Sequence, residues 1–206
     1  MNLKKAALLL IIGLFYTFLH KVIIGLFPFL MNSGLTNVIL SVLWLTAAFT
    51  IILFAYFFLK EIIHVNLQIK LSLVFVIIFT GIILLLKLPF ELFTFSQPTK
   101  RILFDAASLL NGLSQLTFLI LFYKTLKEDI YFLKQSIRLA IWGYGLGLII
   151  GLIGLGYYLK FLTTGLITKP LPFLPIIAGL VTIFTYYAVI IFLIRFRKVE
   201  DYKQLK

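Results

Sequence analysis

The feature that most constrains the fold is a series of long apolar runs that recurs along the whole chain. A run of about 20 apolar residues crosses the hydrocarbon core of a bilayer as one α-helix, and a helix bonds all its own backbone polar groups, as lipid requires. Such runs lie at 6–26, 36–59, 71–88, 102–123, 139–159 and 171–194. We therefore predict an all-α, polytopic integral membrane protein, with six transmembrane helices in one bundle and a single transmembrane domain over residues 1–206. No small-residue cleavage site follows the first run, so we predict a retained anchor rather than a signal peptide.

The composition excludes several classes of protein and of site. The chain is 62% hydrophobic and 13% charged, with a mean hydropathy of +1.12, whereas a soluble domain is about half apolar and about a quarter charged. It contains no cysteine, which removes disulfides, thiolate metal sites, iron–sulfur clusters and thiol nucleophiles. The connections are too short to hold a soluble catalytic domain. We assign no catalytic residue, no metal site and no cofactor, and we expect a role other than catalysis.

The net charge of +12 comes mostly from short segments beside the apolar runs, where it would lie close to a membrane surface. Most Lys and Arg residues lie in 1–5, 60–70, 124–138 and 195–206, beside the ends of apolar runs. These segments share one side of a six-span bundle, and short basic loops stay inside, so we predict cytoplasmic termini. The expected partner is the anionic inner leaflet and not nucleic acid. We also predict an amphipathic surface helix over 124–138. The abundance of Phe, Ile, Leu and Lys favours a prokaryotic cytoplasmic membrane.

The fourth apolar run carries the densest set of polar side chains of any run in the chain. At 100° per residue these side chains fall within about a third of the helix circumference, opposite a face of leucines. They are Asp105, Ser108, Asn111 and Gln115, with Gly112 beside them. Hydrocarbon offers no water to them, so the stripe has to face the inside of the bundle. Two interpretations stay open: the stripe lines a ligand site, or it supplies hydrogen bonds between helices.

Charged groups cluster at the expected outer end of the bundle. His20 and Lys21 lie near that end of the first run, and Asp105 lies four residues after Arg101, within reach of an ion pair. Alternatively, Asp105 faces Lys21 across the bundle, because a carboxylate below the headgroups is costly unless it is paired. The outer cluster would then be net positive and suited to an anionic or zwitterionic small ligand. The candidate ligand-binding residues are Asp105, Ser108, Asn111, Gln115, Lys21 and His20.

The fifth run carries a face of glycines at Gly143, Gly147, Gly151 and Gly154. Small residues at this spacing let a second helix approach closely, so we predict a helix-packing face. The partner helix is either in the same chain or in another membrane subunit, and that subunit is either a second copy of the chain or a different protein.

A threefold pattern accompanies the six runs. A Pro-Phe pair occurs in each expected outer connection, at 28–29, 89–90 and 172–173. The second, fourth and sixth runs end as FFLKE, YKTLKED and RFRKVED. The pattern indicates either a triplicated helical hairpin or convergence, because every hairpin needs an outer turn and a basic inner anchor.

Three functions fit these observations. The size and topology resemble those of the substrate-binding membrane subunits of energy-coupling-factor transporters, although the small residues of the first run lack the spacing usual there. The resemblance implies a solute-binding or transport-type subunit whose site the Asp105–Gln115 face would line. The alternatives are a structural, assembly or sensory subunit of a larger membrane complex, and an intramembrane lipid-modifying enzyme using Asp105, Glu91 and His20. A polar cavity open to one side beside Asp105 and Asn111 would favour the first, and a dry, filled bundle the second.

Overall fold

The computed structural model describes residues 2–26, 34–61, 66–87, 97–126, 130–164 and 173–199. This part of the chain is folded into helices and contains no strand. The helices are α1 (Leu3–Leu26), α2 (Gly34–Glu61), α3 (Leu67–Lys87), α4 (Gln97–Thr125), α5 (Tyr131–Thr164) and α6 (Leu174–Arg197). The prediction of an all-α bundle of six helices is confirmed.

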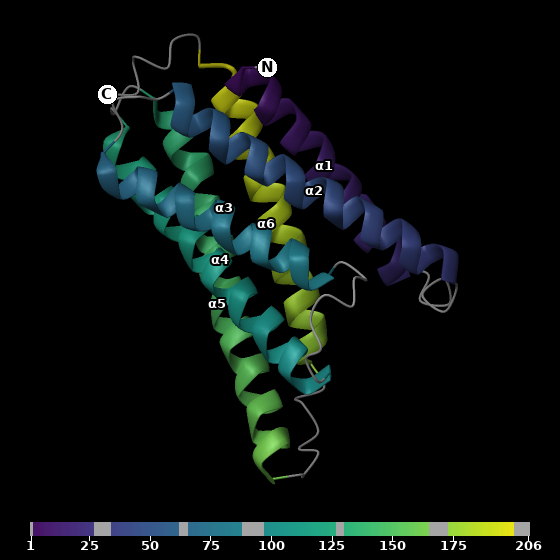
Figure 1. Ribbon diagram of the computed structural model, residues 1–206. Coiled ribbons are helices and arrows are strands. Elements are labelled where there is room, and N and C mark those ends of the chain that lie inside the picture. The colour runs from purple at the N-terminus through teal and green to yellow at the C-terminus, as the bar shows by residue number, and fades with distance from the viewer. Residues whose placement is uncertain are drawn as a thin grey trace.

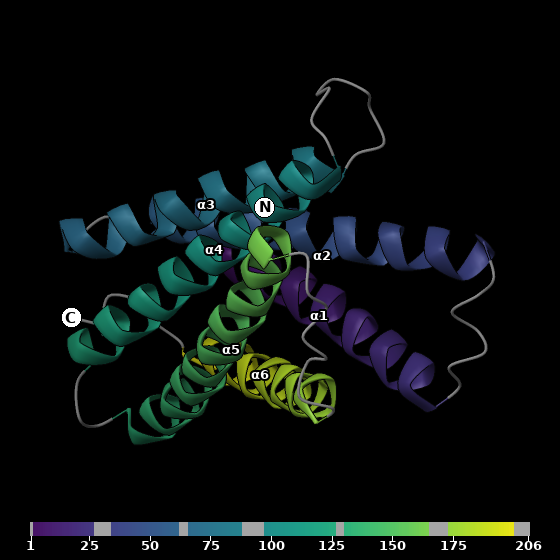
Figure 2. The ribbon, with the colours of Figure 1, turned by 90° about the horizontal axis from the view of Figure 1, so that it is seen from below.

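The six helices form a ring in chain order. Each helix packs against the next one along the chain, and α6 packs back against α1. Figure 2 shows the ring from below, with the helices spreading toward the viewer. The start of α1 and the end of α6 lie at the same end of the bundle (Figure 1), which we call the termini end, and we call the opposite end the far end. The even-numbered helices α2, α4 and α6 all run toward the termini end.

Four of the described helices are long and apolar enough to cross a membrane. The qualifying stretches are Leu67–Leu86, Arg101–Thr125, Tyr131–Thr164 and Leu174–Arg197. The other two helices, α1 and α2, contain 24 and 28 residues. At about 1.5 Å per residue they measure about 36 Å and about 42 Å, which exceeds the thickness of about 30 Å of a hydrocarbon core. Their crossing of the bilayer stays a prediction.

The fifth helix differs from its predicted form. The described residues of 124–138 form no separate surface helix, because α4 continues to Thr125 and α5 begins at Tyr131. Two apolar residues of this stretch, Leu133 and Ile137, are fully buried against the other helices, whereas Tyr131 and Phe132 are exposed. Because the side chains of Leu133 and Ile137 are buried, the residues from Tyr131 to Arg138 form the first two turns of α5. This helix has 34 residues and is about 51 Å long. Pro175 lies in the first turn of α6, where its missing N–H costs no helical hydrogen bond.

Large apolar side chains fill the half of the bundle at the termini end. Phe58, Phe122 and Phe196, one from each even-numbered helix, are among the most fully buried side chains of the described residues. Aromatic rings have the area to fill the centre of a ring of six helices, where aliphatic chains of ordinary length leave gaps. This half is therefore closed.

Hydroxyl groups in the same half bond to their own helices. The Ser72 hydroxyl donates to the Ile69 carbonyl, and the Ser136 hydroxyl donates to the Leu133 carbonyl, each at 2.8 Å. Without water, a buried hydroxyl needs such a partner, and the carbonyl one turn earlier is the nearest one. These serines pack as small residues and present no free polar group.

The helices spread apart toward the far end (Figure 1), although glycines further along the bundle allow close contacts. A Cβ added at Gly13 of α1 would lie 2.9 Å from Thr50 Oγ1 and 3.3 Å from Ala47 Cα on α2. Gly143 of α5 lies equally close to Thr185 of α6. Gly151 of α5 lies as close to Leu109 of α4, so close contacts occur within a hairpin and also between hairpins.

Candidate functional site

A cavity of about 650 Å³ occupies the far half of the bundle. Its walls come from all six helices, with most of the residues on α4, α5 and α6. It ends at Ile51, Gln115 and Val189, one turn before the phenylalanine-filled half begins. The bundle is thus hollow in one half and filled in the other.

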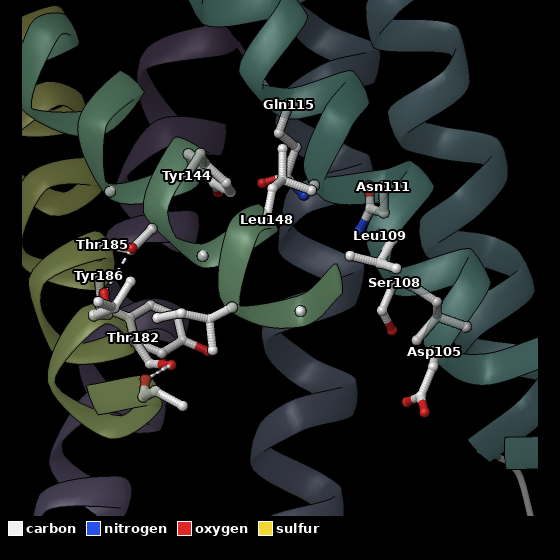
Figure 3. Close-up of a pocket in the computed structure, with 18 of the residues that line it drawn as sticks. Asp105, Ser108, Leu109, Asn111, Gln115, Tyr144, Leu148, Thr182, Thr185 and Tyr186 are labelled. Atoms are coloured by element: carbon white, nitrogen blue, oxygen red, sulfur yellow. Dashed lines mark hydrogen bonds between the residues drawn. The ribbon is translucent and has the colours of Figure 1, made fainter. Parts of the chain in front are cut away.

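The polar stripe predicted for α4 lines this cavity. Asp105, Ser108, Asn111 and Gln115 are all wall residues, and so is Gly112. Figure 3 shows them one above another along α4. Asp105 and Gln115 are ten positions apart on α4, which places polar groups over about 15 Å of depth. Asp105 lies nearest the far end and Gln115 lies at the cavity floor.

The polar groups of α4 differ in how they are bonded. The Thr80 hydroxyl of α3 donates to Asn111 Oδ1 at 3.3 Å, and Thr80 is only 2% exposed. No acceptor among the described residues bonds the Asn111 amide nitrogen, so both of its hydrogens are open to a partner in the cavity. Within the described residues, the side chains of Ser108 and Gln115 have no hydrogen-bond partner. Polar groups without partners this deep in an apolar bundle are costly unless water or a ligand reaches them.

Arg101 and Asp105 form an ion pair at the cavity mouth. Arg101 Nε lies 4.0 Å from Asp105 Oδ2, one turn apart on α4, and the side chains are 65% and 36% exposed. The Arg101 guanidinium also lies over the Tyr158 ring of α5, 4.3 Å from its centroid. The structure thus pairs Asp105 within its own helix. The alternative partner, Lys21, and the candidate ligand residue His20 have side chains outside the described residues, and Glu91 lies outside them altogether.

The four glycines of α5 divide into two kinds. Gly143 packs on α6, where an added Cβ would lie 2.9 Å from Thr185 Cα, and at Gly151 it would lie 2.8 Å from Leu109 Cδ2 of α4. Gly147 and Gly154 have open space beside them. All four glycines line the cavity. This face therefore lets helices pack closely at two positions and leaves space for the cavity at the other two.

Sequence reasoning missed the polar residues that α5 and α6 contribute. Tyr144 of α5 and Thr182, Thr185 and Tyr186 of α6 line the cavity, and Figure 3 shows the α6 group across the cavity from α4. The signal was present, because Thr182, Thr185 and Tyr186 recur at helical spacing on one face. Tyr187, the next residue, is 56% exposed and points away from that face.

The wall opposite these groups is apolar. On α1 and α2 the cavity is lined by Leu14, Ala47, Ala48 and Ile51. The cavity is therefore two-sided, with hydrogen-bonding groups on α3, α4, α5 and α6 and hydrocarbon on α1 and α2. A ligand with one polar and one apolar side would match both walls.

Comparison of the chain with family models, with curated proteins and with solved structures gives no match.

Proposed function

We propose that this protein is a solute-binding or transport-type membrane subunit, and that the cavity is its binding site. The observation that carries the proposal is the coincidence of the α4 polar stripe with a cavity of about 650 Å³. Ligand sites of small molecules measure roughly 300–1,000 Å³ and combine an apolar lining with a few placed polar groups. Hydrogen bonds serving packing alone would leave a filled bundle.

The charges of the lining favour an uncharged or zwitterionic solute. The charged lining residues within the described part of the chain are Arg101 and Asp105, whose formal charges cancel. The deeper groups are amides, hydroxyls and phenols, which bond neutral donors and acceptors. An isolated net charge would have no counter-charge at the floor beside Gln115, so a purely anionic ligand fits less well.

We further propose that the protein lies in a prokaryotic cytoplasmic membrane with both termini inside. The basic segments at the ends of α2, α4 and α6 support this orientation. The far end would then face outward, and the cavity would receive its solute from outside.

The test is native mass spectrometry of the detergent-purified protein, with matched glycine variants. Gly147 and Gly145 are two residues apart on α5, and both have open space beside them, but only Gly147 lines the cavity. We expect the wild type and Gly145→Leu to retain a bound small molecule that Gly147→Leu loses. Gly154→Leu and Gly156→Leu form a second pair of the same design.

Both members of each pair should fold, because an added Cβ meets open space at all four positions and replacing a helical glycine gains helix propensity of up to about 1 kcal/mol. Retention of the same ligand by Gly147→Leu and Gly145→Leu would count against the cavity as the site. A bound protein subunit in place of a small molecule would favour the structural or assembly role.

A further inference from the structure

The odd-numbered helices repeat one pattern of burial in the same register. Near the start of α1, α3 and α5, two positions three residues apart are buried in each helix. The first set is Leu3, Ile69 and Leu133, and the second is Ala6, Ser72 and Ser136. A lysine follows the first position in every copy, as Lys4, Lys70 and Lys134.

The even-numbered helices repeat a second pattern, Phe-x-x-x-Phe-x-Lys. It occurs once near the end of each of α2, α4 and α6. The first phenylalanines are Phe54, Phe118 and Phe192, the second are Phe58, Phe122 and Phe196, and the lysines are Lys60, Lys124 and Lys198. A basic anchor explains the lysine alone, but it does not explain two phenylalanines at fixed spacing before it.

The second phenylalanines form a closed triangle. The ring centroids of Phe58 and Phe122 are 5.4 Å apart, those of Phe122 and Phe196 are 6.1 Å apart, and those of Phe58 and Phe196 are 5.9 Å apart. Each ring comes from a different even-numbered helix, so the triangle lies on the central axis of the bundle.

Contacts between the two phenylalanine layers follow the same threefold rule. Each ring of the triangle touches the first phenylalanine of the next even-numbered helix around the axis. The pairs are Phe58 with Phe118 at 5.2 Å, Phe122 with Phe192 at 6.3 Å, and Phe196 with Phe54 at 5.9 Å. Convergence on basic anchors predicts no such cyclic order, whereas three copies of one hairpin about an axis do.

The central axis continues from the triangle into a small hollow region that borders the cavity. A small void of about 60 Å³ lies between the cavity and the triangle, with Phe54, Phe118 and Phe192 in its wall. Ile51, Gln115 and Val189 line both the void and the cavity. These three residues are also threefold equivalents, each three positions before the first phenylalanine of its helix.

We propose that the chain is three tandem copies of one helical hairpin, that their common axis is the path of the solute, and that Phe58, Phe122 and Phe196 seal this path at the termini end. The inference rests on the proposed solute site and adds the direction in which the solute moves. Along the axis the cavity gives way to the void, then to the triangle, and then to the exposed Lys60, Lys124 and Lys198. Most of the wall of the void is apolar, which disfavours water there as well as a polar solute.

The experiment uses the natural absence of cysteine. A reporter cysteine, Ile51→Cys, is placed at the boundary of cavity and void in protein reconstituted in sealed vesicles. A membrane-impermeant methanethiosulfonate reagent is added to one side at a time. With the seal intact, the reporter should be labelled from the far end and not from the termini end.

The seal is opened with Phe58→Ala, Phe122→Ala and Phe196→Ala in one chain. We expect the labelling rate from the termini end to rise at least about tenfold, which corresponds to about 1.4 kcal/mol. The matched control is Leu3→Ala, Ile69→Ala and Leu133→Ala, an equivalent buried set that lines neither cavity nor void. The control should leave the reporter protected from the termini end.

An equal rise in both triple variants, or none in the seal variant, would overturn the seal. The single variants Phe122→Ala and Leu133→Ala carry the same comparison if a triple variant does not fold. Loss of far-end labelling in the intact protein would instead count against the cavity as a solute site, so the two proposals fail separately.

Discussion

The two halves of this bundle are built from the same six helices and differ in what fills the centre. In the half at the termini end, phenylalanines from α2, α4 and α6 meet on the axis and leave a void of about 60 Å³. In the far half, α4 and α6 turn amides and hydroxyls toward the interior and α5 turns glycines toward it. A cavity of about 650 Å³ results. The comparison teaches that side-chain volume along the axis decides which half can hold a solute.

The largest expected effect is in the filled half. Truncating Phe122, which is 1% exposed, with Phe122→Ala should cost about 3–5 kcal/mol of stability. The control is Phe15→Ala on α1, where the ring is 49% exposed and lies on the lipid-facing side. The stability of both variants is measured by heating them in detergent and monitoring the remaining folded protein by size-exclusion chromatography. Similar losses for Phe122→Ala and Phe15→Ala would mean that the aromatic half is not the packed core.

Gly143→Ala should have the next largest effect. The new methyl group would lie 2.9 Å from Thr185 Cα, which is backbone and cannot turn aside, so we expect a loss of about 1–3 kcal/mol. Gly147→Ala, one turn later with open space beside it, should be neutral or gain up to about 1 kcal/mol. The same unfolding assay decides, and equal losses would contradict the division of the glycine face.

A smaller effect is expected at the α3–α4 hydrogen bond. Thr80→Val keeps the shape of the side chain and leaves Asn111 Oδ1 without its donor, which should cost about 1 kcal/mol. Thr46→Val is the control, because the Thr46 hydroxyl is exposed and bonds only to the Val42 carbonyl of its own helix. If both valines have the same effect, the bond between Thr80 and Asn111 does not stabilise the cavity wall.

The smallest change in stability is expected at the cavity mouth. Asp105→Asn breaks a partly exposed ion pair, so the stability should fall by less than about 1 kcal/mol. The amount of bound ligand, measured by native mass spectrometry, should change. The reason is that the cavity mouth then carries the positive charge of Arg101 without a counter-charge. A loss of folded protein equal to the loss of ligand would assign Asp105 to packing.

Much of the fold could be predicted because lipid leaves few alternatives. Long apolar runs fixed the helix positions, and a polar stripe at helical spacing identified the inner face of α4. The start of α5 was predicted eight residues too late, because its first two turns are amphipathic and only the tertiary contacts of Leu133 and Ile137 bury them. The α6 wall was missed because threonine and tyrosine are common packing residues, and only the helix arrangement shows which face turns inward. The order of the phenylalanine contacts depends on three helices meeting at one axis, which no single segment encodes.

A cysteine scan of residues 105–115 tests the contrast between hollow interior and lipid-facing exterior most directly. The natural chain contains no cysteine, so each variant carries a single thiol. Each single variant is reacted with a water-soluble, membrane-impermeant thiol reagent in vesicles. We predict rapid labelling at Ser108, Asn111 and Gln115, and slow labelling at Leu110 and Leu113, which are 44% and 51% exposed on the lipid-facing side. Slow labelling at Asn111 and Gln115, matching that of Leu113, would contradict the water-accessible polar cavity on which the account rests.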